Sequence, residues 1–144
     1  MPKNTHSVYA IYFHLIFTVK YRKKLLANTE FDSCVKESIQ NIATKHNFQI
    51  EKMQSDRDHI HVLVSAPPRI SAYQIVSLIK QHTTYDIWQK YPNDLQKEFW
   101  KEHIFWTRSN FINSIGSVSK DNIERYIANQ GGSSAALKDS GLAA

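Results

Sequence analysis

The sequence has few of the residues from which many small chemical sites are built. Four glycines leave no glycine-rich phosphate loop, of either the GxxxxGK or the GxGxxG type, which argues against ATP or dinucleotide chemistry. One cysteine, Cys34, excludes an intramolecular disulfide and a cysteine-rich zinc site, and it favours a reducing compartment. No leader-like segment occurs, and no apolar run approaches the roughly 18 residues of a membrane span. We therefore expect a cytoplasmic protein with no membrane partner and no nucleotide cofactor.

Acidic residues are outnumbered by basic ones. The chain has 18 Lys and Arg against 13 Asp and Glu, a net charge of +5, and such a surface attracts polyanions. Hydrophobic residues make up 42% of the 144 positions, which is enough for a core and too much for a disordered chain. The length fits one domain, which we expect at 1–131, followed by a small polar tail at 132–144 that we expect to be flexible.

Hydrophobic periodicity predicts strands that alternate with helices. The expected strands are 8–19, 48–54, 59–66 and 103–112 (the last with a break at 107–110), and the expected helices are 30–46, 72 to about 88, and 119–130. Ser71 is expected to cap the second helix. This order predicts an α+β, ferredoxin-like (RRM-like) split βαβ fold, in which an antiparallel sheet carries helices on one face and a further helix follows at the C-terminal end.

Two histidines stand two residues apart in the third predicted strand. His59 and His61 should point to the same face, about 6 to 7 Å apart, where two imidazoles can bind one metal ion. Ile60 and Val62 alternate with them and can pack beneath the helices. The spacing fits equally well with two histidines on a solvated face that have no chemical role. Neighbouring Asp58 either fixes the tautomer of an imidazole or is an ordinary turn residue, and we favour the turn.

Tyr126 and Gln130 lie four residues apart in the last predicted helix, and therefore on one face of it. Because a helix of this length needs an apolar face, the spacing alone favours a core aromatic at Tyr126 and a solvated residue at Gln130.

Read together and in order, four segments resemble the single-tyrosine transposases of the HUH nuclease superfamily, the small enzymes of the Insertion Sequence 200/605 family. The segments are YFHLIFTVKYRKKLL, DHIHVLVSAPP, FWTRSNFINSIGSVS and IERYIANQ. The His, hydrophobic residue, His pattern of the superfamily is met by His59, Ile60 and His61. The resemblance implies that Tyr126 is the nucleophile and that Gln130 is the third metal ligand.

The resemblance also implies a function. It implies a transposase that cleaves and rejoins single-stranded DNA at insertion-sequence ends through a 5′-phosphotyrosine intermediate, with help from a divalent cation. Two imidazoles and an amide oxygen suit Mn²⁺ better than Mg²⁺, and we expect one of the two. The implied partners are single-stranded DNA with subterminal hairpins and a second copy of the chain. A homodimer that joins its sheets would also protect the apolar first strand, if that strand were an exposed edge.

Basic, tryptophan and histidine side chains elsewhere in the sequence are further candidates for DNA contacts or for the core. Basic residues that either contact phosphates or form a solvated loop are Lys20, Arg22, Lys23 and Lys24, and Arg108 is a further candidate for DNA contact. Tryptophans expected in the core or an interface, rather than as stacking platforms, are Trp88, Trp100 and Trp106. Histidines expected to be structural or solvated are His6, His14, His46, His82 and His103.

Two rival functions remain open. Composition and fold fit a noncatalytic ferredoxin-like regulator that binds nucleic acid. A small metal-dependent phosphodiesterase without a covalent step is the other. Retention of His59, His61, Tyr126 and Gln130 favours the transposase.

Overall fold

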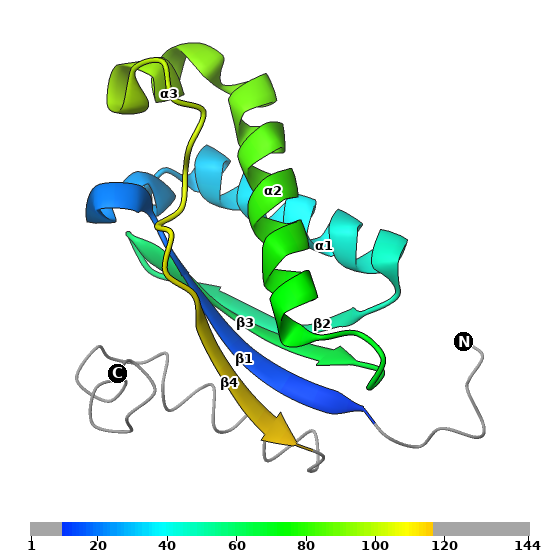
Figure 1. Ribbon diagram of the computed structural model, residues 1–144. Coiled ribbons are helices and arrows are strands. Elements are labelled where there is room, and N and C mark those ends of the chain that lie inside the picture. Colours follow the sequence, from blue (N-terminus) through cyan, green and yellow to red (C-terminus); the bar gives the residue numbers. More distant parts are fainter. Residues whose placement is uncertain (1–9, 117–144) are drawn as a thin grey trace.

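A computed structural model describes residues 10–116 of the chain (Figure 1). Its strands are β1 (Ile11–Thr18), β2 (Gln49–Ser55), β3 (His59–Ala66) and β4 (Phe111–Gly116), its α-helices are α1 (Thr29–His46), α2 (Ala72–Lys90) and α3 (Pro92–Phe99), and its short 3₁₀ turns are η1 (Lys20–Arg22) and η2 (Leu25–Ala27). The predicted helix at 119–130 and the predicted tail lie outside the described residues. No helix within residues 10–116 is long and apolar enough to cross a membrane.

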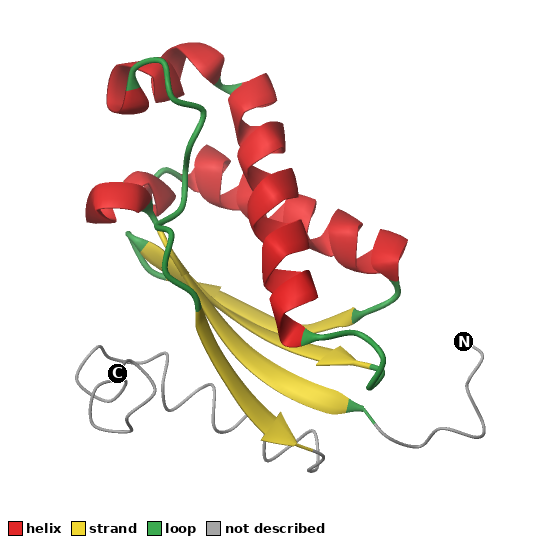
Figure 2. Ribbon diagram, in the orientation of Figure 1, coloured by secondary structure: helices red, strands yellow, loops and turns green. Residues whose placement is uncertain are grey.

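The four strands form one antiparallel sheet in the order β2-β3-β1-β4. Helices α1 and α2 pack against the same face of this sheet and against each other (Figure 2). Both findings confirm the predicted ferredoxin-like fold. The apolar first strand is not an exposed edge, because β1 lies between β3 and β4, so it needs no second copy of the chain to cover it. Within residues 10–116, β2 and β4 are the outer strands.

Local sequence signals explain where the two long helices begin. Asn28 accepts hydrogen bonds from the backbone N–H groups of Glu30 and Phe31 at the start of α1. At the start of α2, Ser71 accepts from the N–H of Gln74, whose side chain accepts from the N–H of Ser71, a capping box. The predicted cap at Ser71 is confirmed.

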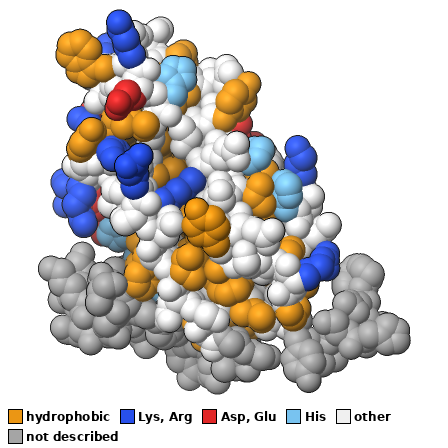
Figure 3. Space-filling model, viewed as in Figure 1, with side chains coloured by type: hydrophobic (Ala, Val, Ile, Leu, Met, Phe, Trp, Pro, Cys, Tyr) orange, Lys and Arg blue, Asp and Glu red, His pale blue; other side chains and the backbone are white. Residues whose placement is uncertain are grey.

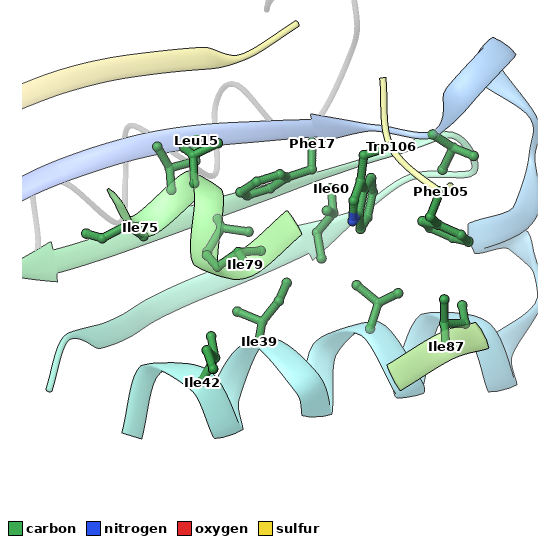
Figure 4. Close-up of a cluster of buried hydrophobic side chains, with 14 of the residues drawn as sticks. Leu15, Phe17, Ile39, Ile42, Ile60, Ile75, Ile79, Ile87, Phe105 and Trp106 are labelled. Atoms are coloured by element: carbon green, nitrogen blue, oxygen red, sulfur yellow. The ribbon is translucent and has the colours of Figure 1, made fainter. Parts of the chain in front are cut away.

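The core lies between the sheet and the helices. Alternate residues of β1 and β3 face the helices, and Figure 4 shows Leu15, Phe17 and Ile60 directed toward Ile39 of α1 and Ile79 of α2. All five side chains are almost fully buried. Because successive strand residues point to opposite faces, the histidines between these apolar residues lie on the face opposite α1 and α2 (Figure 2).

The prediction of a strand at 103–112 is largely wrong. Regular pairing starts only at Phe111, and before it Trp106 makes one isolated bridge to Val19. Phe105 and Trp106 are nevertheless buried in the core. Their strand-like composition therefore reflects burial under the helices, and it does not reflect membership of the sheet.

Candidate functional site

His59 and His61 lie side by side on the sheet face opposite α1 and α2. Their ring centroids are 5.1 Å apart and the ring planes are inclined by 71°. The intervening Ile60 is fully buried on the helix-covered face, as the alternation predicts. The strand therefore separates a structural face from a face with two imidazoles.

Asp58 links His59 to the basic segment after β1. Its Oδ1 accepts a hydrogen bond from Nδ1 of His59 at 2.8 Å, and its Oδ2 lies 3.3 Å from Nε of Arg22. Burial alone would raise the pKa of Asp58, but the hydrogen bond from His59 and the positive charges of Arg22 and Lys24 outweigh it, so this pKa is lowered. The carboxylate fixes the Nδ1–H tautomer of His59, so the preference for a mere turn residue is wrong.

His14, which the sequence interpretation grouped with the structural or solvated histidines, contacts the pair directly. Its Nε2 lies 3.0 Å from Nδ1 of His61, and both side chains are buried. Burial, followed by the charge of His61, lowers the pKa of His14 to about 4, and burial followed by the charge of His59 lowers that of His61 to about 4. Both rings are therefore neutral at neutral pH, which is the form that binds metals.

The donor chemistry of the pair fits a divalent cation. Nδ1 of His59 and Nδ1 of His61 each face a hydrogen-bond partner, so Nε2 is the ring atom through which either would bind a metal. Within residues 10–116, no group of three His, Cys, Asp or Glu side chains is placed to hold a metal ion. A metal bound here needs a further ligand of another type or from another part of the chain. Gln130, the predicted third ligand, and Tyr126 lie outside the described residues.

The basic segment after β1 forms an exposed surface with two aromatic side chains. Tyr21 in η1 is 67% exposed and Trp100, which follows α3, is 78% exposed. The expected core position of Trp100 is therefore wrong, and its alternative role in an interface stays a prediction. Tyr21 approaches Phe99, the residue before Trp100, with ring centroids 6.4 Å apart. Figure 3 shows Lys and Arg side chains gathered on the side of the molecule where Figure 1 places η1 and α3.

The predicted basic contact residues have different partners. Arg22 pairs with Asp58, Lys23 pairs with Glu98 of α3 at 3.1 Å, and Lys20 lies over the ring of Tyr21. Lys24 is exposed in the same segment. The segment is therefore a structured surface, with Arg22 connected through Asp58 to the histidine pair.

Arg108 lies in a separate place, beside a cleft of about 730 Å³ between α2 and residues 103–110. Lys80 connects α2 to the segment that carries Arg108. Its Nζ donates hydrogen bonds to the carbonyl oxygens of Thr107 and Ser109 at 2.9 and 3.0 Å and to Oδ1 of Asn110 at 2.7 Å. The cleft is on the helix-covered side of the sheet. It is thus a different surface from the one that carries His59 and His61.

Comparisons with known proteins agree on one family. The family model "Transposase IS200 like" matches residues 7–130. The ISDra2 transposase TnpA of Deinococcus radiodurans is 28% identical over 130 residues, covering 90% of this chain and 91% of the relative. The transposase of insertion sequence IS200 from Salmonella typhimurium is 23% identical over 125 residues, covering 87% and 80%.

Two solved structures have the same fold. A transposase from Deinococcus radiodurans R1 aligns with a TM-score of 0.68 and 26% identity, over 92% of this chain and all of the other. A REP-associated tyrosine transposase bound to a REP hairpin aligns with a TM-score of 0.57 and 14% identity, over 89% and 72%.

Proposed function

Because the chain belongs to the IS200-like transposase family, we propose that it cleaves and rejoins single-stranded DNA at insertion-sequence ends, with Tyr126 as the nucleophile. One observation carries the proposal. His59 and His61 lie together on a sheet face with their Nδ1 atoms facing hydrogen-bond partners, which is how metal-binding histidines are held.

The proposed chemistry keeps the energy of the phosphodiester. The phenol of Tyr126 gives up its proton as its oxygen attacks phosphorus, an O–P bond to the tyrosine forms, and the bond from phosphorus to the 3′-oxygen breaks. The leaving oxygen takes up a proton, which gives a 3′-hydroxyl and a 5′-phosphotyrosine. A second 3′-hydroxyl later attacks that phosphorus, and the phenol of Tyr126 leaves. No nucleoside triphosphate is consumed, in keeping with the absent phosphate loop.

A phenol with a pKa of about 10 is a weak nucleophile at neutral pH, so the phosphate must be made more reactive. A divalent cation, when bound, polarises a nonbridging phosphate oxygen and stabilises the charge of the transition state. In this proposal His59, His61 and Gln130 hold Mn²⁺ or Mg²⁺. Asp58 orients His59 through the hydrogen bond to Nδ1.

The proposed DNA surface is the exposed basic segment beside the histidine pair. Lys20, Arg22, Lys23 and Lys24 contact phosphates, and Tyr21 with Trp100 offers faces on which unpaired bases stack. Arg108 is a second contact on the other side of the sheet. Subterminal hairpins as substrate belong to the proposal because the family resemblance implies them, and the cytoplasmic location expected from the sequence is proposed with them.

A homodimer is also part of the proposal. Within the described residues β2 and β4 have one unpaired side each, so either can extend the sheet into a second copy. Whether the chain forms a dimer is measured by light scattering of the purified protein.

The metal role is tested by replacing each histidine of the pair with alanine. His59→Ala and His61→Ala are expected to lower the rate of Mn²⁺-dependent cleavage of labelled single strands by about 100-fold or more, since even an outer partner of a ligand is worth about 10 to 100-fold. His82→Ala, on α2, is the matched control and is expected to cleave normally. Wild-type rates in both site variants would contradict the metal role.

The same assay separates the rival functions. A noncatalytic regulator would bind the strands and cleave none of them. A phosphodiesterase would hydrolyse them in the presence of metal without any covalent protein–DNA product.

A further inference from the structure

The hydrogen bond between His14 and His61 has an informative geometry. The ring planes are within 13° of parallel, and the centroids are 5.2 Å apart although the bonded nitrogens are 3.0 Å apart. The centroid distance exceeds the nitrogen distance by nearly two imidazole radii. Such a large excess arises only when both bonded nitrogens lie close to the line that joins the two centroids, so that each nitrogen points at the other ring. The two rings therefore meet edge to edge in almost one plane, and they do not stack face to face.

A hydrogen bond between two imidazole nitrogens contains one proton. Two charged rings would direct two N–H groups at each other, and two bare nitrogens would repel each other. Burial disfavours the charged form of either ring, so each neutral imidazole has one donor and one acceptor. The position of a single proton thus decides which nitrogen of His61 is bare.

The ring of His14 is also held from a second strand. It packs edge to face against Phe111 of β4, with centroids 5.9 Å apart and planes inclined by 81°. Because β1 lies between β3 and β4, His14 contacts both neighbours in the sheet. Its ring orientation is thereby fixed relative to His61.

From this geometry, taken with the proposed metal-binding role of His61, we infer that His14 is a positioning residue for the metal site. Its Nε2 accepts the proton of His61 Nδ1 and leaves His61 Nε2 as the metal ligand. The inference rests on the proposed function, because it requires His61 to bind the cation. His14 does for His61 what the Asp58 carboxylate does for His59. The two ligands differ in one respect: the partner of His59 is an anion and the partner of His61 is neutral, so His61 is the weaker electron donor.

The first test reads the tautomer in the unaltered protein. A long-range ¹H–¹⁵N correlation spectrum of the metal-free, full-length chain at neutral pH distinguishes protonated from bare ring nitrogens. The expected spectrum has His61 protonated at Nδ1 and bare at Nε2, with the His61→Ala spectrum as the assignment control. A proton on Nε2 of His61 would overturn the inference, and this result requires no DNA and no activity.

The second test measures Mn²⁺ binding by calorimetry. His14→Phe, which keeps an aromatic ring but has no acceptor, is expected to weaken binding by about 10 to 100-fold. His14→Gln is expected to retain most of the affinity, because its amide oxygen can take the place of Nε2. His82→Phe is the matched control and should bind as the wild type does. Circular dichroism establishes that each variant is folded.

Two different failures can be told apart. Wild-type affinity in folded His14→Phe, or equal losses in the Phe and Gln variants, would overturn the role of His14 alone. Wild-type affinity in His61→Ala would instead overturn the metal site of the proposed function. If the Phe variant does not fold, the Gln variant and the spectrum of the wild type still decide the question.

Discussion

Replacing Thr83 with valine tests how the segment that carries Arg108 is held to α2. The Thr83 hydroxyl is fully buried; it donates to the carbonyl of Ile79 at 2.6 Å and accepts from Nε1 of Trp106 at 2.7 Å. Valine has the same shape and no hydroxyl. The substitution therefore leaves the indole N–H of Trp106 in the interior without its acceptor.

The expected loss of stability comes from the unpaired indole N–H of Trp106. A buried donor without a partner costs about 1 to 3 kcal/mol, and the extra apolar burial of valine offsets at most about 0.8 kcal/mol. We therefore expect Thr83→Val to lower the free energy of unfolding by about 1 to 2 kcal/mol. That is a large part of a typical stability of about 5 to 15 kcal/mol.

Urea denaturation followed by circular dichroism measures this loss, and a double-mutant cycle assigns it. In a Trp106→Phe background no indole N–H is present, so Thr83→Val should then cost little. Equal losses in the two backgrounds would refute the reasoning, because the cost could not come from the Trp106 hydrogen bond.

Three further variants probe the other contacts. Lys80→Met removes the ammonium group that binds the segment bearing Arg108. Urea denaturation is expected to show the free energy of unfolding lowered by about 1.5 to 3 kcal/mol, and an unchanged midpoint would contradict this role of Lys80. Asp58→Asn weakens the partner of the His59 imidazole, so calorimetry should show Mn²⁺ affinity reduced by about 10-fold, whereas wild-type affinity would dismiss its orienting role. Trp100→Ala should weaken single-strand binding by about 1 to 3 kcal/mol in fluorescence anisotropy while stability is kept. Tyr85→Ala, which removes another exposed aromatic side chain, on α2, is the control for Trp100, and equal effects of the two would argue against a stacking platform.

Elements with a local signal could be predicted from the sequence. The cap at Ser71 and the alternation around Ile60 depend on residues close together in the chain, and the structure has both as expected. The same alternation placed His59 and His61 on one face. These predictions needed no knowledge of which strands pair.

Features that depend on pairing between distant segments were missed. His14 and His61 are 47 residues apart in sequence, and only the register of β1 against β3 brings them together. A signal was present, since Phe13 and Leu15 alternate as core residues and leave His14 on the other face. The central position of β1 was predicted only through the ferredoxin-like fold as a whole, since no local pattern contains the sheet order.

The exposure of Trp100 also could not be predicted from the sequence. Phe99 is buried and Trp100 is exposed, and the backbone between them turns at Trp100, which has a φ of 60°. A left-handed conformation is uncommon for a bulky residue, so composition predicts neither the turn nor the exposure of the side chain. Aromatic residues in sequence do not by themselves separate core positions from surface ones.

The proposed function requires Tyr126 to become covalently joined to DNA. The most direct measurement is a denaturing gel of wild type and Tyr126→Phe, each incubated with labelled single strands from insertion-sequence ends, with and without Mn²⁺. The wild type is expected to give a labelled protein–DNA band with Mn²⁺, and Tyr126→Phe is expected to give none although it still binds the strands. An adduct of equal yield in Tyr126→Phe, or cleavage by the wild type without any adduct, would contradict the proposed function.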